Sequence, residues 1–267
     1  MNRIDNVLDM LHKKNEKALI PYVSCGDPSL EFTEQLATIL AESGADIIEL
    51  GVPYSDPVAD GPIIQRASGR ALAGGVTLEK IFSLVKRLRE KTQVPLIIMT
   101  YYNPVYVTGV ENFIARAASV GIDGLIIPDL PLEEAGYLKK AADSNNINLI
   151  LLVAPTSSPE RIKRIAQLSK GFIYCVSVTG VTGTRQSTSG GLEDFLDQVR
   201  LQTKLPLAVG FGVSGPDTAR KMANKADGVI VGSAIIQKIE ENVQKGDTLK
   251  ALEEAVSFIN TLKKAIG

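Results

Sequence analysis

The sequence of 267 residues predicts an α/β fold of the single (β/α)8 barrel type, the TIM barrel. First, apolar, β-rich runs recur along the chain at intervals of mostly ~20 to 30 residues, with segments of helical periodicity between them. Second, these runs are almost continuously apolar, which is typical of a parallel sheet buried on both faces. Third, a helix end, an Asp and an apolar strand recur together at 43–51, 120–128 and 224–232.

The expected elements follow in order. Apolar residues at helical spacing near the N-terminus predict an extra helix before any strand: Ile4, Val7, Leu8 and Leu11. The eight expected strands lie at 19–24, 46–50, 95–101, 124–128, 148–153, 171–176, 206–210 and 227–231. Extra helices are expected in the loops after strands 2 and 8, one around 63–72 and one with an apolar face of Leu249, Leu252, Val256, Ile259 and Leu262. No linker divides the chain, so we expect residues 1–267 to form one domain.

The charge and hydropathy patterns exclude several classes of protein. The formal net charge is −1 and the sequence pI is about 6.0, so nothing favours binding to nucleic acid or to an anionic membrane. The first residues are amphipathic but lack the apolar core and cleavage site of a signal peptide. No apolar run approaches the ~20 residues needed to span a bilayer. We therefore expect a cytoplasmic chain.

The few cysteines and histidines limit the chemistry. Cys25 and Cys175 lie in apolar runs without metal-ligand spacing, which predicts buried, reduced thiols. His12 is the only histidine, so a multi-histidine metal site is excluded, as is Ser–His or Cys–His catalysis unless His12 itself serves. His12 lies near the end of the first expected helix, where a cation suits the helix dipole, and we interpret it as structural. No metal site is expected.

The stretch IELGVPYSDPVADG (48–61) contains the most unusual residue of the chain. Glu49 lies inside an apolar strand, on the same face as Ile47, and a buried carboxylate costs several kcal/mol unless it is paired or takes a proton. Asp60 follows in a loop that could return over the strand end. One carboxyl in a dry site and one in a wetter loop is the arrangement that separates acid from base roles. The alternative is a structural Glu49 paired with an Arg or Lys.

Two intervals between strands are longer than the others and follow strand ends, where barrels carry their catalytic loops. The first begins just past Glu49 and holds Asp60. The second contains TGVTGTRQSTSGG (179–191), whose glycines and small polar residues favour a mobile lid over a substrate. The alternative for this segment is an ordinary surface loop.

The last two expected strands end in VGFGVS (209–214) and VGSA (231–234). In each, a glycine allows the backbone to approach a ligand, and a serine, Ser214 or Ser233, stands where it could cap the next helix. Backbone N–H groups and the helix dipole would then form an anion site, a recurring feature of loops seven and eight in such barrels. The alternative is that the glycines serve only tight strand-to-helix turns.

The stretch 48–61 resembles, position for position, the signature of the tryptophan synthase alpha subunit family, in which a strand Glu precedes a P-[FY]-S-D-P-hydrophobic-A-D-G loop. LIPYVSCGDP (19–28), DLP (129–131), SVTGVTGTR (177–185) and GFGVS (210–214) are similar to further family motifs, in family order. The resemblance implies a lyase that cleaves indole-3-glycerol phosphate to indole and glyceraldehyde 3-phosphate without a cofactor in this chain, with Glu49 and Asp60 as the catalytic residues.

The same resemblance implies roles for further residues. The phosphate would be held, mainly by backbone N–H groups, by Gly183, Phe211, Gly212, Gly232 and Ser233. Thr182 would come from the lid, and the other residues lining the substrate pocket would be Tyr22, Tyr101, Ile126, Asp129, Leu152 and Tyr174. Tyr22 stands where many relatives have Phe, and Cys25 where a smaller residue is usual, so packing around the indole could differ.

The family also implies a partner, a beta subunit that carries pyridoxal phosphate and joins indole to serine in an alpha2beta2 complex. The segments 53–60 and 103–109 resemble the parts of the family that contact this partner. Asp56 is a candidate for signalling to the partner, and the alternative is a solvent-facing turn residue. Two rival functions stay open on the residues alone. One is another phosphosugar barrel, such as a phosphoribosyl isomerase or the enzyme that forms indole-3-glycerol phosphate. The other is a barrel subunit without catalysis that activates a partner enzyme.

Overall fold

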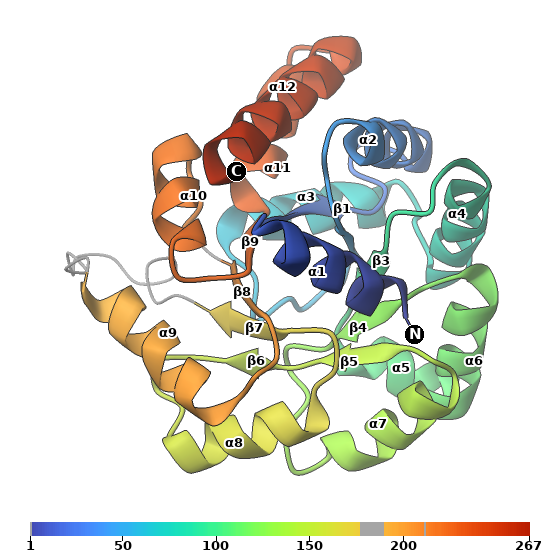
Figure 1. Cartoon of the computed structure of the whole chain (residues 1–267). Helices are drawn as coiled ribbons and strands as arrows, with labels where there is room; N and C mark the ends of the chain where they lie inside the picture. The colour runs from blue at the N-terminus through green and yellow to red at the C-terminus, as the bar shows by residue number, and fades with distance from the viewer. Residues whose placement is uncertain (1, 177–189, 211) are drawn as a thin grey trace.

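A computed structural model describes residues 2–176, 190–210 and 212–267 and has a barrel of parallel strands surrounded by helices (Figure 1). Within those ranges the strands are β1 (Ala18–Ser24), β2 (Ile48–Gly51), β3 (Leu96–Met99), β4 (Gly124–Ile126), β5 (Asn148–Ile150), β6 (Leu152–Val153), β7 (Ile173–Val176), β8 (Leu207–Gly210) and β9 (Gly228–Val231). Each of the eight runs expected from the sequence contains a strand, and the fifth run contains two, β5 and β6. The predicted third strand was too long, because Tyr101 is instead the N-cap of a helix.

The order of the strands closes the sheet. Neighbours follow β5-β4-β3-β2-β1-β9-β8-β7-β6, so β5 and β6 form the two ends of the sheet. Only Leu151 separates these two strands along the chain, and its carbonyl accepts the Tyr174 N–H of β7 at 3.1 Å. The sheet therefore returns to its own starting strand, which confirms the predicted (β/α)8 TIM barrel.

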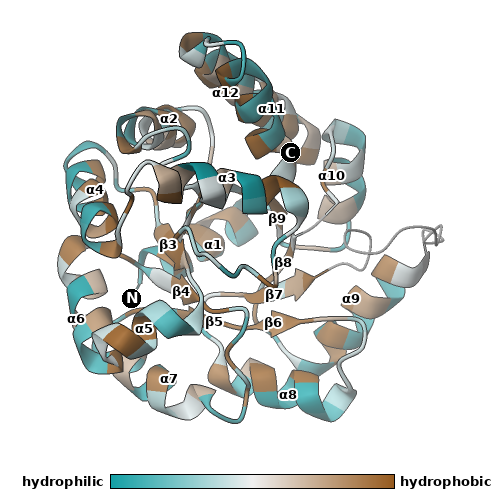
Figure 2. Ribbon diagram, turned by 180° about the vertical axis from the view of Figure 1, so that it is seen from behind, coloured by the Kyte–Doolittle hydropathy of each residue, from teal (hydrophilic) through white to brown (hydrophobic). Residues whose placement is uncertain are grey.

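The helices pack around the barrel with polar outer faces (Figure 2). They are α1 (Arg3–Lys14), α2 (Leu30–Glu42), α3 (Pro62–Ala73), α4 (Leu78–Lys91), α5 (Tyr102–Thr108), α6 (Val110–Val120), α7 (Ala135–Ser144), α8 (Pro159–Leu168), α9 (Gly190–Gln202), α10 (Pro216–Ala223), α11 (Ser233–Val243) and α12 (Thr248–Ile266). No helix in the described ranges combines the length and the apolarity needed to cross a membrane.

The three extra helices expected from the sequence are α1, α3 and α12. On α12, Leu249 is exposed and does not share the buried face that includes Leu252, Ile259 and Leu262. Helix α5 was not predicted, because it is too short to show a clear apolar period. Its Pro104 lies in the first turn, where the missing N–H is tolerated.

Two layers of apolar side chains fill the molecule. Ile48 and Leu50 of β2 belong to the outer layer, between the barrel and the helices. Ile47 belongs to the inner layer, which fills the barrel together with Ile20, Ile97, Ile126, Ile150, Phe172, Ala208 and Ile230. Cys25 and Cys175 are buried free thiols, as predicted, and burial raises the pKa of both to about 12.

Helix α1 closes the N-terminal end of the barrel. Its buried residues Ile4, Leu8 and Leu11 join the inner layer. Ile4 also lies against Gly124 at the start of β4 and Gly171 just before β7, close enough that a Cβ on Gly124 would be 2.7 Å from the Ile4 Cδ1 atom. Because this end is filled, only the carboxyl ends of the strands remain for a site inside the barrel.

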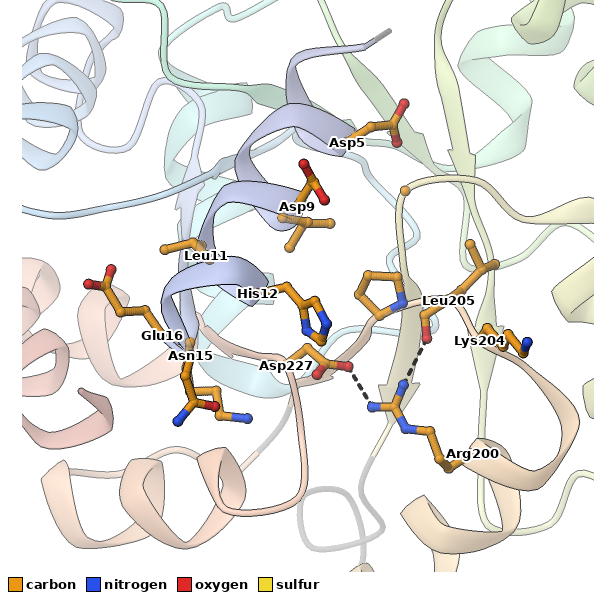
Figure 3. Close-up of a pocket in the computed structure, with 14 residues that line it drawn as sticks. Asp5, Asp9, Leu11, His12, Asn15, Glu16, Arg200, Lys204, Leu205 and Asp227 are labelled. Carbon is orange, nitrogen blue, oxygen red and sulfur yellow. Dashed lines mark hydrogen bonds and ion pairs between the residues drawn. The ribbon is translucent and has the colours of Figure 1, made fainter.

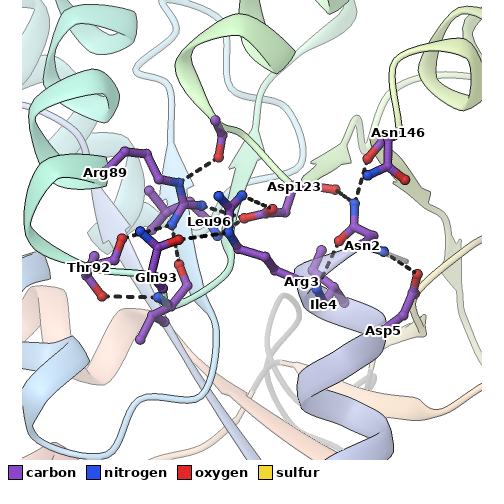
Figure 4. Close-up of polar contacts among 12 residues, drawn as sticks. Asn2, Arg3, Ile4, Asp5, Arg89, Thr92, Gln93, Leu96, Asp123 and Asn146 are labelled. Atoms are coloured by element: carbon purple, nitrogen blue, oxygen red, sulfur yellow. Dashed lines mark hydrogen bonds and ion pairs between the residues drawn. The ribbon is translucent and has the colours of Figure 1, made fainter.

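A polar cluster around Asp123 fixes α1 in this position (Figure 4). The Asn2 side chain caps α1 and donates to the Asp123 carbonyl at 2.8 Å, and Arg3 donates to the Asp123 carboxylate at 2.9 Å. The same carboxylate accepts the Leu96 N–H at 2.9 Å and forms an ion pair with Arg89. Asp123 thus joins α1, α4 and the starts of β3 and β4.

We expect Asp123→Ala to lower the free energy of unfolding by about 3 to 5 kcal/mol, because it leaves the mostly buried Arg89 guanidinium without its partner. Urea denaturation measures this loss. Glu79→Ala breaks the exposed Arg116–Glu79 pair and should lower it by less than about 1 kcal/mol. Equal losses in the two variants would show that Asp123 holds nothing in place.

Candidate active site

Glu49 points into the barrel. In the parallel ladder it is in register with Tyr22 on β1 and with Ile97 on β3, and the Ile97 side chain belongs to the inner layer. Glu49 is 1% exposed, and no ion pair from the described residues reaches it. Its Oε2 atom is buried without a hydrogen-bond partner in the same part of the chain. The alternative of a structural Glu49 paired with an Arg or Lys therefore finds no support there.

This environment changes the protonation of Glu49. Burial, together with a smaller contribution from the negative charge of Asp60, raises the pKa of Glu49 to about 8. The carboxyl therefore keeps its proton at neutral pH but can lose it within the working range of an enzyme. A group with such a pKa can act as both general acid and general base.

Asp60 lies in the loop between β2 and α3 and is held by Tyr101. The Tyr101 hydroxyl donates to Asp60 Oδ2 at 3.1 Å and accepts the Ala59 N–H at 2.9 Å. Burial raises the pKa of Asp60 to about 6, and the hydrogen bond from Tyr101 limits the rise. Asp60 is thus ionised at pH 7 while Glu49 is protonated, which is the separation of roles that the sequence suggested.

Two tyrosines lie beside these carboxyls, each against a glycine of the next strand. A Cβ on Gly51 would lie 2.0 Å from the Tyr22 hydroxyl oxygen, and a Cβ on Gly210 would lie 2.3 Å from that of Tyr174. Burial raises the pKa of both phenols well above its usual value, and the charges of Asp60 and Glu49 add to the rise, so both phenols stay neutral. This contact of Gly51 was not predicted from the sequence. The available signal was a glycine directly after an apolar strand.

Three further residues predicted for the substrate pocket lie on β4, on β6 and in the loop after β4. Ile126 is buried in the inner layer, and the half-buried Leu152 packs against that layer. Asp129 is exposed after β4, and its carboxylate accepts the Tyr102 N–H at 2.9 Å. Tyr102 is the first residue of α5, so Asp129 supplies a hydrogen bond to the start of that helix.

The predicted phosphate end lies over the adjacent strands β8 and β9. Gly212 has a φ of 82°, a conformation that favours glycine, and Gly232 is the N-cap of α11. A Cβ on Gly232 would lie 3.4 Å from the Tyr22 Cβ, so this glycine borders the tyrosine next to Glu49. The backbone at the start of α11 is therefore close to the carboxyl site.

The prediction that serines cap the helices at this end was wrong. Ser233 is the first residue of α11, and its N-cap Gly232 makes no side-chain hydrogen bond. At α10 the Thr218 hydroxyl accepts the N–H groups of both Ser214 and Gly215, at 3.1 Å each. Thr218 satisfies these donors from within the helix, which leaves the two serine hydroxyls free of that role.

Three predicted site residues lie outside the described residues: Thr182, Gly183 and Phe211. Most of the predicted lid at 179–191 also lies outside them. The prediction extended two residues too far, because positions 190 and 191 are the first two residues of α9.

A separate cavity of about 370 Å³ lies at the opposite end of the barrel, beside α1 (Figure 3). His12, in the last turn of α1, borders it, and Arg200 and Asp227 form an ion pair in its wall. Neither Glu49 nor Asp60 lines this cavity. In the part of the chain that the structure describes, no three His, Cys, Asp or Glu side chains are grouped so that they could hold a metal ion.

Comparisons with known proteins agree on one family. The family model "Tryptophan synthase alpha chain" matches residues 8–266. The tryptophan synthase alpha chain of Alkaliphilus metalliredigens is 51% identical over 263 residues, covering 98% of each chain. The crystal structure of tryptophan synthase subunit alpha from Legionella pneumophila has a TM-score of 0.93 at 38% identity and covers 100% of this chain and 98% of that one. A chain of the tryptophan synthase complex from Pyrococcus furiosus has a TM-score of 0.83 at 35% identity, with coverage of 92% and 98%.

The raised pKa of Glu49 predicts how stability depends on pH. Between pH 4.5 and 8 the unfolded chain ionises Glu49 while the folded chain does not, so the group lowers stability increasingly as the pH rises. We expect Glu49→Gln to leave the free energy of unfolding nearly unchanged at pH 4. At pH 9 it should raise that energy by on the order of 4 kcal/mol, since each pKa unit corresponds to about 1.4 kcal/mol.

Urea denaturation at the two pH values measures the effect, and Glu253→Gln, on the exposed side of α12, serves as the control. A gain from Glu49→Gln that is the same at pH 4 and pH 9 would contradict a raised pKa for Glu49.

Proposed function

The chain belongs to the tryptophan synthase alpha chain family, and from this premise we propose that its barrel mouth catalyses the alpha reaction of tryptophan biosynthesis. The proposed reaction is a carbon–carbon lyase step, the cleavage of indole-3-glycerol phosphate to indole and glyceraldehyde 3-phosphate. The observation that carries this proposal is the protonated Glu49 inside the barrel, which has no ion-pair partner in the part of the chain that the structure describes and is near an ionised Asp60. We also propose a cytoplasmic location.

The reaction needs a proton to move twice. Glu49 gives its proton to C3 of the indole ring, and N1 then shares the resulting positive charge. The bond from C3 to the glycerol carbon breaks, and its electron pair restores the aromatic ring. The hydroxyl on that carbon returns its proton to the Glu49 carboxylate as the aldehyde forms, which regenerates the acid.

Asp60 and the tyrosines act on the indole half of the substrate. The Asp60 carboxylate accepts the indole N–H and stabilises the positive charge that develops on the ring. Tyr101 holds that carboxylate in place by its hydrogen bond. The buried rings of Tyr22 and Tyr174 lie beside Glu49 and help to exclude water from its carboxyl group.

The phosphate half would bind at the ends of β8 and β9. Backbone N–H groups near Gly212 and at the start of α11 present partial positive charge, which suits a phosphate. Binding energy from this remote group orients the reacting carbon next to Glu49. We propose that residues 179–189, with Thr182 and Gly183, cover the bound substrate, and that Phe211 adds to the phosphate site.

No step of this reaction uses a cofactor, and we propose that this chain carries none. Pyridoxal phosphate would belong to a beta subunit that consumes the indole. The match to a chain of the Pyrococcus furiosus tryptophan synthase complex supports such a partner. We propose that the two subunits form an alpha2beta2 assembly.

Exposed apolar side chains on the catalytic face support a contact surface for this partner. Val58 lies in the loop that bears Asp60, and Tyr106 and Val107 lie on α5, with exposed fractions of 84%, 69% and 77%. These residues fall in the segments 53–60 and 103–109, which the family resemblance implies as the contact surface for the partner. We propose that Asp56, exposed in the first of them, signals the state of the catalytic loop to the partner.

A subunit that has lost catalysis and only activates its partner is the second candidate. The geometry around Glu49 speaks against it, because a buried, unpaired carboxyl destabilises the fold and serves no structural purpose among the described residues. A different phosphosugar barrel is not favoured by comparisons that agree on one family over nearly the whole chain.

We expect Glu49→Gln to keep the fold and to lower the rate of indole release from indole-3-glycerol phosphate by at least ~10²-fold, because the amide cannot transfer the proton. Asp60→Asn should also lower the rate, because the neutral amide cannot balance the charge on the ring. Indole release by the isolated chain measures both.

Circular dichroism and binding of glycerol 3-phosphate serve as controls for the fold and for the phosphate end. A Glu49→Gln variant with a rate near that of the wild type would show that Glu49 is not the proton shuttle.

For the partner surface, we expect Val107→Asp to weaken capture of the beta subunit in a pull-down, because it places a charge on an exposed apolar contact. Leu201→Asp, at a position on α9 that is 83% exposed, is the matched control and should leave capture unchanged. Equal weakening by both variants would refute a specific role for α5.

A further inference from the structure

A cluster of charged side chains joins α3 to α11. Arg66 of α3 makes two hydrogen bonds to the carboxylate of Glu240 on α11, from Nε to Oε1 at 2.9 Å and from Nη2 to Oε2 at 2.7 Å. Arg70, one turn further along α3, forms an ion pair with the same carboxylate. Glu240 is buried, and its carboxylate on α11 is paired with two guanidinium groups from α3.

The cluster also reaches the loop after β1. Arg70 donates to both oxygens of Asp27, from Nε to Oδ1 at 2.7 Å and from Nη2 to Oδ2 at 2.8 Å. Asp27 is buried, and its N–H bonds to the carbonyl of Ser24 at the end of β1. We call Asp27, Arg66, Arg70 and Glu240 the α3–α11 clamp.

Each helix of the clamp begins at one half of the active site. Asp60 immediately precedes Gly61, the N-cap of α3, and the Gln65 side chain on the first turns of α3 donates to the Asp60 carbonyl at 2.9 Å. The other helix, α11, begins at Ser233, directly after Gly232. The clamp thus connects the helix that follows the catalytic loop to the helix whose N-terminus faces the phosphate end.

We propose that Glu240 is a positioning residue, which through Arg66 and Arg70 keeps Asp60 at a fixed distance from the site that binds the phosphate of the substrate. This inference rests on the proposed function. A substrate anchored by its phosphate presents its indole ring at a fixed distance, so the Asp60 carboxylate must stand at the matching distance from the anchor. Binding at one end is converted into orientation at the other only while the two helices keep their relative position.

Glu240 is suited to this role at any pH at which the enzyme would work. Hydrogen bonds from Arg66, and then from Arg70, lower the pKa of Glu240 to about 2, so the carboxylate stays ionised. Both arginines form ion pairs with Glu240. Among the described residues Arg66 pairs with no other carboxylate, and Arg70 pairs with one other, Asp27. Removing the Glu240 charge therefore loosens both links between the helices at once.

The test compares Glu240→Gln with Glu34→Gln in the full chain. Glu34 is the matched control, because it also joins two helices, α2 and α4, by accepting from two cations, Arg87 at 2.7 Å and Lys91 at 2.6 Å. Three quantities are measured well below the melting temperature of each variant: kcat for indole release, and the affinities for glycerol 3-phosphate and for indole as probes of the two halves of the site.

We expect Glu240→Gln to lower kcat about tenfold while both probe affinities stay within about twofold of the wild type, because each half of the site persists but their register is lost. Glu34→Gln should keep kcat within about twofold. Arg66→Gln removes one arm of the clamp, leaves the Arg70–Asp27 pair intact, and should give a smaller loss of the same kind. This second variant carries the test if Glu240→Gln does not fold.

The proposal is overturned if Glu240→Gln keeps the kcat of Glu34→Gln, or if its kcat and its affinity for glycerol 3-phosphate fall by the same factor. The second result would mean that Glu240 only supports the local fold of the phosphate end. A wild-type chain that releases no indole would instead refute the proposed function, and this arm is measured before any variant is compared.

Discussion

The burial of an unpaired carboxyl inside the barrel is the constraint on which the rest of the site depends. Glu49 is enclosed by its neighbours on β1 and β3 and by the phenols of Tyr22 and Tyr174, and no cation among the described residues compensates it. Such a carboxyl group stays buried in the folded chain at neutral pH because it keeps its proton and is therefore uncharged. The energetic disadvantage of burying Glu49 and its capacity to deliver a proton are therefore the same physical fact.

Several other features are needed to maintain this environment. The buried face of α1 packs on the inner layer at the N-terminal end of the barrel and closes that end with apolar side chains. Gly51 and Gly210 leave room for the phenols of Tyr22 and Tyr174, each of which contacts the backbone of the neighbouring strand. The hydrogen bond from the Tyr101 hydroxyl holds the Asp60 carboxylate in place and limits the rise of its pKa. Each of these features affects either the hydration or the charge of the region around the Glu49 carboxyl group.

The site is assembled from loops that are far apart in the sequence, and helices outside the barrel set the distances between them. Glu240 and Arg66 are 174 positions apart, yet their contact links the loop after β2 to the turn after β9. Rigid strands fix where each loop starts, but the loops themselves need lateral contacts to fix where they end. In this chain α3 and α11 provide such contacts on the side of the barrel where both helices pack against β1 (Figure 1).

The sequence by itself determined the barrel and identified Glu49, because apolar periodicity records which side of each element is buried, and a carboxylate within such a run is anomalous. It could not find α5, which is too short to show a period, or the capping by Thr218 in place of Ser214. It also could not find the contacts of Glu240, whose partners lie on another helix. Only the tertiary structure decided these features, because they depend on which side chains the closed barrel brings within hydrogen-bonding distance, and periodicity along one chain segment carries no information about its distant neighbours.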